Sequence, residues 1–398
     1  MKKAATIILI AATMAGCAVQ QHTESRKDVP PMTADSARSF ATALLGNVEK
    51  LGKEENFCLS PASALWAMAM TADGARSTTA REIYTALGYP TAYKEREAFN
   101  SLQKAEADKY LKSKSARINI ANSIWVKSSI TAKEQFIGDS KYFYDAHVEN
   151  NAFDAQGIKT INKWCSDKSE GKITSILDKP SPSTQMLLVN TLYFKAQWAK
   201  PFYKEATAST TFTKADGSRI KVPMMMQRAS APYYEDSLIQ ATRKHFELGE
   251  YSMLFILPKR GVSIESAASH LASLYNKEFC NSNQHMVMLS LPRFKSEYAT
   301  SLKPALKAMG IKEAFTNKAS FDDISDTSLK IDDVIQKTVI EVNEDGAEAA
   351  AVTAVQMMLT SARRQEKKVL TLDRPFIYAI TAADGKILFI GKMGNPLE

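Results

Sequence analysis

Residue types that could support catalysis are sparse in this chain of 398 residues. The histidines are few, and none stands in the HExxH spacing with which a helix holds zinc; they are His22, His147, His245, His270 and His285. The sequence has neither the GxSxG turn of a serine nucleophile nor a glycine-rich loop that could hold phosphate. A Ser/His/Asp triad would have to assemble from distant residues, with no local pattern to indicate it. We therefore predict neither an enzyme nor a metal or cofactor site.

The first residues, MKKAATIILIAATMAGC, combine two lysines with an apolar run and a cysteine. A run this short predicts a secretory signal rather than a retained membrane span. Its end, Met14-Ala15-Gly16-Cys17, resembles a bacterial lipobox, which implies removal of residues 1–16 and a lipid on Cys17. The polar residues 17–35 then predict a flexible tether. We expect an exported protein that is lipid-anchored to a bacterial membrane, on the periplasmic or the cell-surface side of an outer membrane. An ordinary signal peptide with a chance cysteine is the alternative.

The other cysteines and the overall charge exclude further classes of protein. Cys58, Cys165 and Cys280 are too few and too far apart for a disulfide framework, so we expect buried free thiols. The net charge of +8 comes without a lysine-rich or arginine-rich run. A mild positive excess of this kind predicts no nucleic-acid partner.

Hydrophobic periodicity predicts alternating helices and strands after residue 35. Apolar residues have helical spacing in 36–51, 63–88 and 301–310. Apolar or alternating runs rich in β-forming residues indicate strands in 117–127, 186–198, 250–258 and 285–298. Since no internal linker or repeat interrupts this order, we predict a single mixed α+β domain with a large sheet.

One stretch, EVNEDGAEAAAVTAVQMMLTSARR from Glu341 to Arg364, conflicts with its surroundings. Its alanines favour a helix. The residues on both sides of it, 334–340 and 376–391, have the composition of strands. Small and nearly featureless residues between two strands therefore need an explanation other than local propensity.

Several blocks of the sequence, in the same order along the chain, together resemble the serpin family of serine protease inhibitors. They are Asn56 to Ser63 (NFCLSPAS), Asp73 to Thr79, Ala121 to Val126, Ile161 to Trp164 with Gly171 to Ile173, Val189 to Trp198 (VNTLYFKAQW), Leu291 to Lys295 (LPRFK), Glu341 to Ala351, Arg374 to Phe376 and Phe389 to Pro396. The resemblance implies a serpin domain over residues 36–398 and a monomer. It also implies a large central β-sheet with smaller sheets, about eight or nine helices and an exposed reactive loop at about 344–368.

The resemblance also implies how the unusual stretch works. A target protease cleaves the loop and forms an acyl-enzyme, and the loop then inserts into the main sheet as a new strand. Alternate side chains of a strand share one face, so small residues on that face can enter the core without desolvating a charge. The hinge residues implied are Glu344, Gly346, Ala347, Ala349, Ala350, Ala351 and Thr353. A non-inhibitory binding or structural lipoprotein on the same fold is the rival interpretation.

Family spacing places the cleaved bond at Thr360-Ser361, although the loop is about four residues longer than usual. Met358, Leu359 and Thr360 suit elastase-like proteases first and chymotrypsin-like proteases second. Arg363 and Arg364 are alternative cleavage sites for trypsin-like proteases, and papain-like proteases remain further candidate partners. A cut at either arginine would add about 10 to 13 Å of slack to the inserted arm, so we expect turnover there rather than inhibition.

Motif matches imply a polar cluster where the central strands part, formed by Ser60, Ser63, Asn190 and Gln336. The family usually has a histidine where this chain has Gln336, so we expect a cluster without a pH-sensitive group near neutrality. A surface position for Gln336 in another register is the alternative. Trp198 matches the tryptophan beneath the point where the loop first enters the sheet. Acidic residues interrupt the basic ones in 91–115, so we predict no polysaccharide cofactor.

Overall fold

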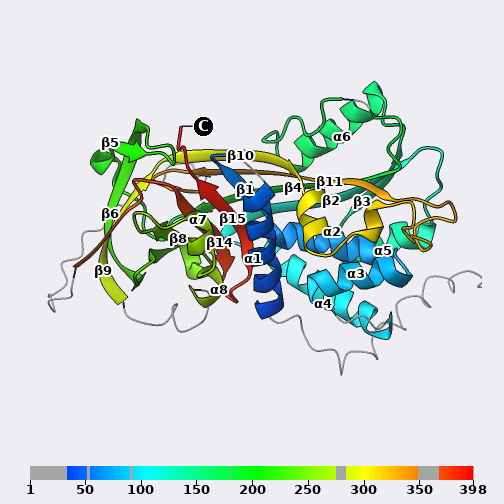
Figure 1. Cartoon of the computed structure of the whole chain (residues 1–398), viewed down its shortest axis with the longest axis horizontal. Helices are drawn as coiled ribbons and strands as arrows, with labels where there is room; N and C mark the ends of the chain where they lie inside the picture. Colours follow the sequence, from blue (N-terminus) through cyan, green and yellow to red (C-terminus); the bar gives the residue numbers. More distant parts are fainter. Residues whose placement is uncertain are drawn as a thin grey trace, which may run out of the picture.

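Two β-sheets organise the molecule, with helices packed around them (Figure 1). The computed structural model describes residues 34–51, 54–89, 93–179, 181–274, 284–347 and 367–397. Within these residues the predicted α+β architecture with a large central sheet is confirmed. The predicted loop residues 348–366, together with Cys17, His22 and Cys280, lie outside the described residues.

The first sheet contains the long central strands, which run along the long axis of the molecule (Figure 1). Its strands, in spatial order, are β10 (Phe294–Ser301), β11 (Ile331–Val342), β12 (Gly346–Ala347), β4 (Met186–Gln197), β2 (Ala116–Lys127) and β3 (His147–Asn151). β11 and β4 also pair directly with each other, in parallel, over most of their length. β12 is antiparallel to both of them.

The second sheet joins nine strands. Its order is β1 (Phe57–Leu59), β15 (Ile387–Met393), β14 (Phe376–Ala382), β8 (Tyr251–Pro258), β7 (Ile239–His245), β6 (Arg219–Glu235), β9 (Gln284–Pro292) and β13 (Lys367–Thr371), with β5 (Ala208–Thr213) on β6. β6 links the two halves because it is 17 residues long. One end of β6 pairs with β7, while the rest pairs with β5 and β9.

Helices cover both faces of the six-stranded sheet. α6 (Ala155–Lys168) lies on one face, and α2, α3, α4 and α5 lie on the other (Figure 1). The helices are α1 (Ala34–Leu51), α2 (Pro61–Asp73), α3 (Ser77–Leu87), α4 (Tyr93–Leu111), α5 (Glu134–Tyr144), α6, α7 (Ile264–Ala268), α8 (Leu271–Leu274) and α10 (Lys303–Ala308), with short 3₁₀ turns at Lys204–Ala206, Glu247–Gly249 and Glu313–Phe315. No helix in the described part of the chain is long and apolar enough to span a membrane.

Local chemistry explains where the elements begin and end. The Ser60 side chain caps α2 by accepting a hydrogen bond from the Ser63 amide at 3.2 Å, and Pro61 occupies the first turn. The helical stretch predicted over 63–88 is two helices, because α2 ends at Asp73 and α3 begins at Ser77. The predicted strand over 285–298 is likewise two strands, β9 and β10, which belong to different sheets.

The core has two parts, one on each side of the six-stranded sheet. The larger part fills the space between this sheet, α1, α2 and the nine-stranded sheet. The smaller part lies beneath α6, where Trp125, Ile161 and Cys165 pack against Val189 and Val339. Both faces of β4 are therefore buried, in agreement with its continuous apolar run.

Candidate functional site at the seam between β4 and β11

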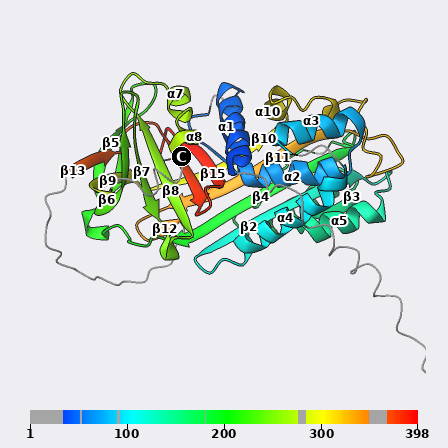
Figure 2. The same ribbon diagram turned by 90° about the horizontal axis from the view of Figure 1, so that it is seen from below.

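The seam is the line along which β4 and β11 meet, and one of its ends is open. The two strands pair directly from Met186 with Ile331 to Tyr193 with Val339. Beyond this point they part, and β12 lies between them (Figure 2). There Ala347 pairs with Ala196 on one side and with Val342 on the other. Among the residues that the structure describes, Gly346 and Ala347 lie in this opening, as a short strand antiparallel to both neighbours.

Gly346 and Ala347 have the residue types that this narrow opening requires. The Ala347 side chain is fully buried and lies on the core face beside Ala196 and Val342, which are also buried. A Cβ atom on Gly346 would come within 2.1 Å of the Ala196 carbonyl oxygen. Backbone cannot give way as the end of a flexible side chain can, so glycine is required at this position.

Glu344 holds the turn before β12 in place through a buried carboxylate. Only 5% of its side chain is exposed, and Arg293 Nη2 lies 2.6 Å from Oε1. Thr207 Oγ1 donates to the same oxygen at 2.7 Å. Burial alone would raise the pKa of Glu344, but these two hydrogen bonds, a backbone hydrogen bond and the charge of Arg293 together keep the pKa below its ordinary value.

Residues 198–207 contact the same turn through hydrogen bonds. We call this segment the gate. The Trp198 indole N–H donates to the Asn343 carbonyl at 3.0 Å, and its amide donates to the Asp345 carbonyl at 2.9 Å. The Phe202 amide donates to the Glu344 carbonyl at 2.8 Å. Trp198 is itself fixed by a parallel stack on Phe246, with ring centroids 4.4 Å apart. Trp198 is thus both a core aromatic and a direct support for the turn before β12.

Lys244 lies beneath the gate and was not recognised from the sequence. Its ammonium donates to the Lys200 carbonyl at 2.6 Å and to Gln227 Oε1, and it lies 4.5 Å from the Phe202 ring centroid. Burial lowers the pKa of Lys244 to about 7, and the nearby charge of Lys200 adds to the shift. Lys244 stands in the run Arg243-Lys244-His245 at the end of β7, which is mostly buried. Consecutive cations are rare in buried strands, so this run was the sequence signal that could have indicated Lys244.

The predicted polar cluster lies at the closed middle of the seam. Gln336 Nε2 donates to Asn190 Oδ1 at 2.7 Å and to the Ser60 carbonyl at 3.0 Å. Gln336 Oε1 accepts from the Ser60 amide at 2.8 Å. Asn190 Nδ2 donates to Ser63 Oγ and to Asn122 Oδ1. The structure therefore brings the four predicted residues together in the interior and adds Asn122.

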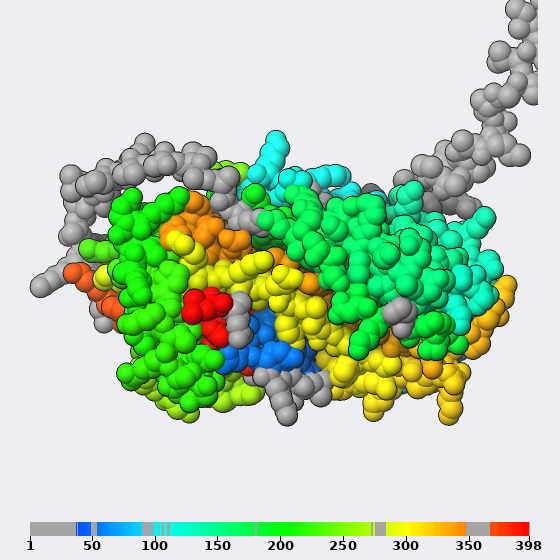
Figure 3. All heavy atoms as spheres, turned by 90° about the horizontal axis from the view of Figure 1, so that it is seen from above, coloured from blue at the N-terminus to red at the C-terminus, as the bar shows by residue number. Residues whose placement is uncertain are grey.

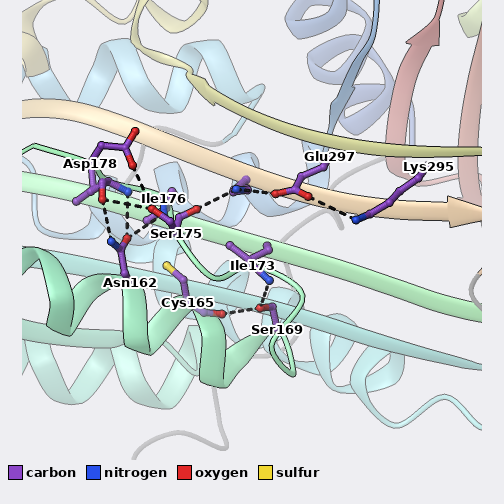
Figure 4. Close-up of polar contacts among 11 residues, drawn as sticks. Asn162, Cys165, Ser169, Ile173, Ser175, Ile176, Asp178, Lys295 and Glu297 are labelled. Carbon is purple, nitrogen blue, oxygen red and sulfur yellow. Dashed lines mark hydrogen bonds and ion pairs between the residues drawn. The ribbon is translucent and has the colours of Figure 1, made fainter. Parts of the chain in front are cut away.

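The outer face of the seam is covered by α6 and the residues that follow it. Ile173, Ile176 and Leu177 pack against the side chains of β4 and β11 that point away from the main core. Asn162 of α6 holds this segment through the amides of Ile176 and Leu177, at 2.9 and 3.0 Å (Figure 4). Any new strand in the seam would have to move or pass beneath this cover.

Lys337 connects the cover to the sheet. Its ammonium donates to the Ser175 carbonyl at 2.9 Å and forms an ion pair with Glu297 of β10 at 2.8 Å. Figure 4 shows Ser175 and Glu297 bridged in this way, with Lys295 on the far side of Glu297. The bridge crosses β11, so it joins the segment after α6 to the neighbouring strand.

The remaining predicted site residues belong to the reactive loop. Ala349, Ala350, Ala351, Thr353, Met358, Leu359, Thr360, Ser361, Arg363 and Arg364 lie outside the described residues. The described histidines lie on separate elements: His147 pairs with Glu149, and His270 pairs with Asp236. The geometry supports adding a strand at an opened seam.

Comparisons with known proteins agree with this geometry. A family model described as Serpin (serine protease inhibitor) matches residues 35–396. An uncharacterized serpin-like protein of Thermococcus kodakarensis is 33% identical over 363 residues, which cover 88% of this chain and 83% of that protein. Neuroserpin of Homo sapiens is 31% identical over 378 residues, with 91% of each chain covered.

Solved structures show the same fold. The native state of tengpin, a thermophilic serpin, matches with a TM-score of 0.82 and 30% identity, and the match covers 93% of this chain and 98% of that one. Human thyroxine-binding globulin in complex with thyroxine matches with a TM-score of 0.82 and 26% identity, covering 92% and 98%. The predicted fold, including its large central sheet, is therefore confirmed.

Proposed function

Because this chain belongs to the serpin family, whose members are in general protease inhibitors rather than enzymes, we propose that it traps serine proteases. In this proposal the protease cleaves the loop that follows β12 and remains attached to it as an acyl-enzyme. The cleaved loop then extends β12 down the seam between β4 and β11. The observation that carries the proposal is the opening itself, where β12 already pairs with both strands.

The register of β12 predicts where each inserted residue would lie. Since Ala347 pairs with Ala196 and Val342, a continuing antiparallel strand would place Ala349 between Phe194 and Ile340. Ala351 would follow between Leu192 and Thr338. The side chains of this set would share the core face of Ala347, where small residues meet little steric resistance.

Thr353 would reach the polar cluster by the same count, between Asn190 and Gln336. These two side chains hydrogen-bond each other across the closed seam at 2.7 Å. An inserted strand must separate them, so Asn190 Oδ1 and Gln336 Nε2 would lose this hydrogen bond in the interior. A threonine hydroxyl can both donate and accept, so Thr353 is suited to replace the lost bond.

The opposite face of the inserted strand is where the charged residue Glu348 would lie. In this register Glu348 would point away from the main core, beside Lys195 of β4. Lys195 is half-buried rather than enclosed, so the carboxylate would keep access to water. The single charge near the start of the insert would therefore avoid the core.

The length of the insert fits a cut at Thr360-Ser361. β4 begins at Met186, and the register pairs this residue with position 357. From Ala347 to Thr360 the chain would move the attached protease by about 43 Å at the rise of a β-strand. We infer that elastase-like proteases are the first targets and chymotrypsin-like proteases the second, with trypsin-like and papain-like enzymes as further candidates.

We propose that the protein is exported and lipid-anchored to a bacterial membrane, as the N-terminal pattern implies. A lipid on Cys17 and the tether 17–35 would hold the domain of residues 36–398 close to a bacterial membrane. Proteases from a host or from neighbouring microbes would then be the relevant partners.

The rival interpretation is a non-inhibitory binding protein on the same fold, as the thyroxine-bound neighbour illustrates for its own ligand. The test mixes residues 18–398 with an elastase-type protease and separates the products on a denaturing gel. We expect a band at the summed mass that survives boiling, since the acyl bond is covalent. Clipped inhibitor with free, active protease would contradict the proposal.

A matched pair of variants sharpens this test. Ala351→Arg would place a charge on the core face of the insert, so we expect no covalent complex and complete turnover. Glu348→Arg changes a residue on the other face and should still form the complex. Equal complex formation by both variants would argue against insertion in this register.

A further inference from the structure

Exposed apolar side chains gather on one face of three neighbouring strands, β6, β9 and β13. The pairing register places Arg228, Met288 and Val369 side by side in one row across these strands. The adjacent rows are Met226, Ser290 and Thr371 on one side and Ser230, Met286 and Lys367 on the other. These residues therefore form a continuous surface from three separate parts of the sequence.

This surface is apolar at its centre and basic at its border. Met226, Met288 and Val369 are 40%, 44% and 56% exposed, and we call these three residues the apolar patch. Arg228 and Lys367 are exposed beside the patch, and the rows named above contain no acidic residue. Flexible methionine side chains can adapt to differently shaped partners, and an exposed apolar group of this kind marks a contact surface.

The patch lies next to the point where the chain leaves the reactive loop. β13 begins at Lys367, directly after the loop, and lies at one end of the long axis beside β5 and β6 (Figure 3). From Ser361 to Lys367 the chain can span at most about 22 Å. A protease domain of about 200 residues has a radius of gyration of about 16 Å. A protease bound at Thr360-Ser361 must therefore lie close to this end of the molecule.

We propose that the apolar patch is a second contact surface for the protease that the loop captures. This inference rests on the proposed function and deepens it. The matching protease surface would be apolar beside its active-site cleft, with acidic side chains opposite Arg228 and Lys367. The patch would increase the rate of the first encounter, whereas the loop sequence would select the bond that is cut.

The test compares association rates for the protein and for a variant with Met226→Ser, Met288→Ser and Val369→Thr. We expect the second-order rate constant for protease inhibition to fall about tenfold, because the encounter loses apolar contact area. The number of inhibitor molecules consumed per protease should stay unchanged, since insertion follows cleavage. A double variant of exposed apolar residues on α4 and α5, Leu102→Ser with Tyr142→Ser, is the control and should keep the original rate.

Charge reversal gives an independent readout. Arg228→Glu should lower the association rate and weaken its dependence on salt concentration, because the basic border attracts an acidic partner. Far-UV circular dichroism and the thermal midpoint of each variant would establish that the fold is retained.

The outcomes separate the two proposals. If the unmodified protein forms no covalent complex with any protease class, both the inhibitory function and the second contact surface are overturned. If it forms the complex and the patch variant reacts at the same rate, only the contact surface is overturned. A patch variant that loses self-association on light scattering and keeps its inhibition rate would assign the patch to a second copy of the chain and overturn the proposal.

Discussion

The open end and the closed middle of the seam differ in the chemistry that stabilises them. At the open end the Glu344 carboxylate pairs with Arg293, and Trp198 supports the turn from below. In the middle, neutral amides and hydroxyls around Asn190 and Gln336 join β4 and β11 directly. The contacts at the open end hold the turn that leads into β12, whereas the neutral hydrogen bonds in the middle join the two strands to each other.

This difference indicates where the proposed insertion would begin and what would resist it. The opening is already occupied by β12, so extending the strand there requires no new break in the sheet. Each further residue inserted would separate one pair of β4 and β11 residues. The inserted residue would then pair with β4 on one side and with β11 on the other. The polar cluster is the first point where buried side-chain hydrogen bonds must also be exchanged.

The largest effect is expected at the opening, from Gly346→Val. A Cβ atom at position 346 would lie 2.1 Å from the Ala196 carbonyl oxygen, so β12 could not remain in place. We expect at least a tenfold rise in the number of inhibitor molecules consumed per protease, because a slower start of insertion favours hydrolysis of the acyl-enzyme. Titration of residual protease activity measures this number, and an unchanged value would show that β12 is not the starting point.

The next effect is expected in the closed middle, from Gln336→Ala. The substitution leaves the Ser60 amide and Asn190 Oδ1 buried without this partner. We expect the free energy of unfolding to fall by about 2 to 3 kcal/mol. Chemical denaturation followed by tryptophan fluorescence measures the change, and a loss below about 0.5 kcal/mol would indicate that water replaces Gln336.

The pH dependence of the same variant tests whether the cluster lacks a titrating group. We expect the difference in stability between the protein and Gln336→Ala to stay constant from pH 7.5 to 5.5. Asp73 titrates in this range, because burial raises its pKa to about 6. Its contribution increases stability as the pH falls, since the folded state takes up the proton first. A stability drop that Gln336→Ala removes would contradict the expectation.

A smaller effect is expected beneath the gate, from Lys244→Met. Because the folded state lowers the pKa of Lys244 to about 7, the unfolded chain binds the proton more strongly above that pH. Stability should therefore rise by about 1 to 3 kcal/mol between pH 7 and 9, and the variant should lack this rise. Lys386, with a pKa lowered to about 8 by burial, contributes in the same direction and remains in both proteins.

The smallest effect is expected from Glu344→Gln at the open end. The amide can still accept from Thr207, so only the charge opposite Arg293 is lost. Since the Arg293 side chain is 49% exposed, solvent screens the pair, and we expect a loss of about 1 kcal/mol. Thermal unfolding at low and high salt measures it. A loss equal to that of Gln336→Ala would remove the distinction between the two regions.

Particular elements show how far sequence reasoning extends. Several of the longer strands were located because apolar runs and β-forming residues have a clear pattern, as in 250–258 and β8, whereas β5, β6 and β7 were not predicted. The boundary between β9 and β10 was missed because Arg293 falls between two alternating runs with the same period. Periodicity identifies a strand and gives no information about the sheet to which it belongs.

The candidate site shows the same limit. Motif matches grouped Ser60 with Gln336, and the structure joins them across 276 positions of sequence. Arg293, Thr207, Asn122 and Lys244 were missed, because each acts through a partner on a distant strand or segment. Lone polar residues in strands are indistinguishable by sequence from ordinary surface residues.

The sequence by itself determined the types of several long elements, the small residues of the hinge and the uncharged character of the polar cluster. These properties depend on residue types and on spacings of a few residues, so they can be predicted without knowing which distant parts of the chain are in contact. Only the tertiary structure decided that β4 and β11 part beyond Tyr193, that Lys244 is buried beneath Trp198 and that Met226, Met288 and Val369 share one face. Strand pairing between distant residues sets these features, because hydrogen bonds and burial depend on which backbones lie side by side.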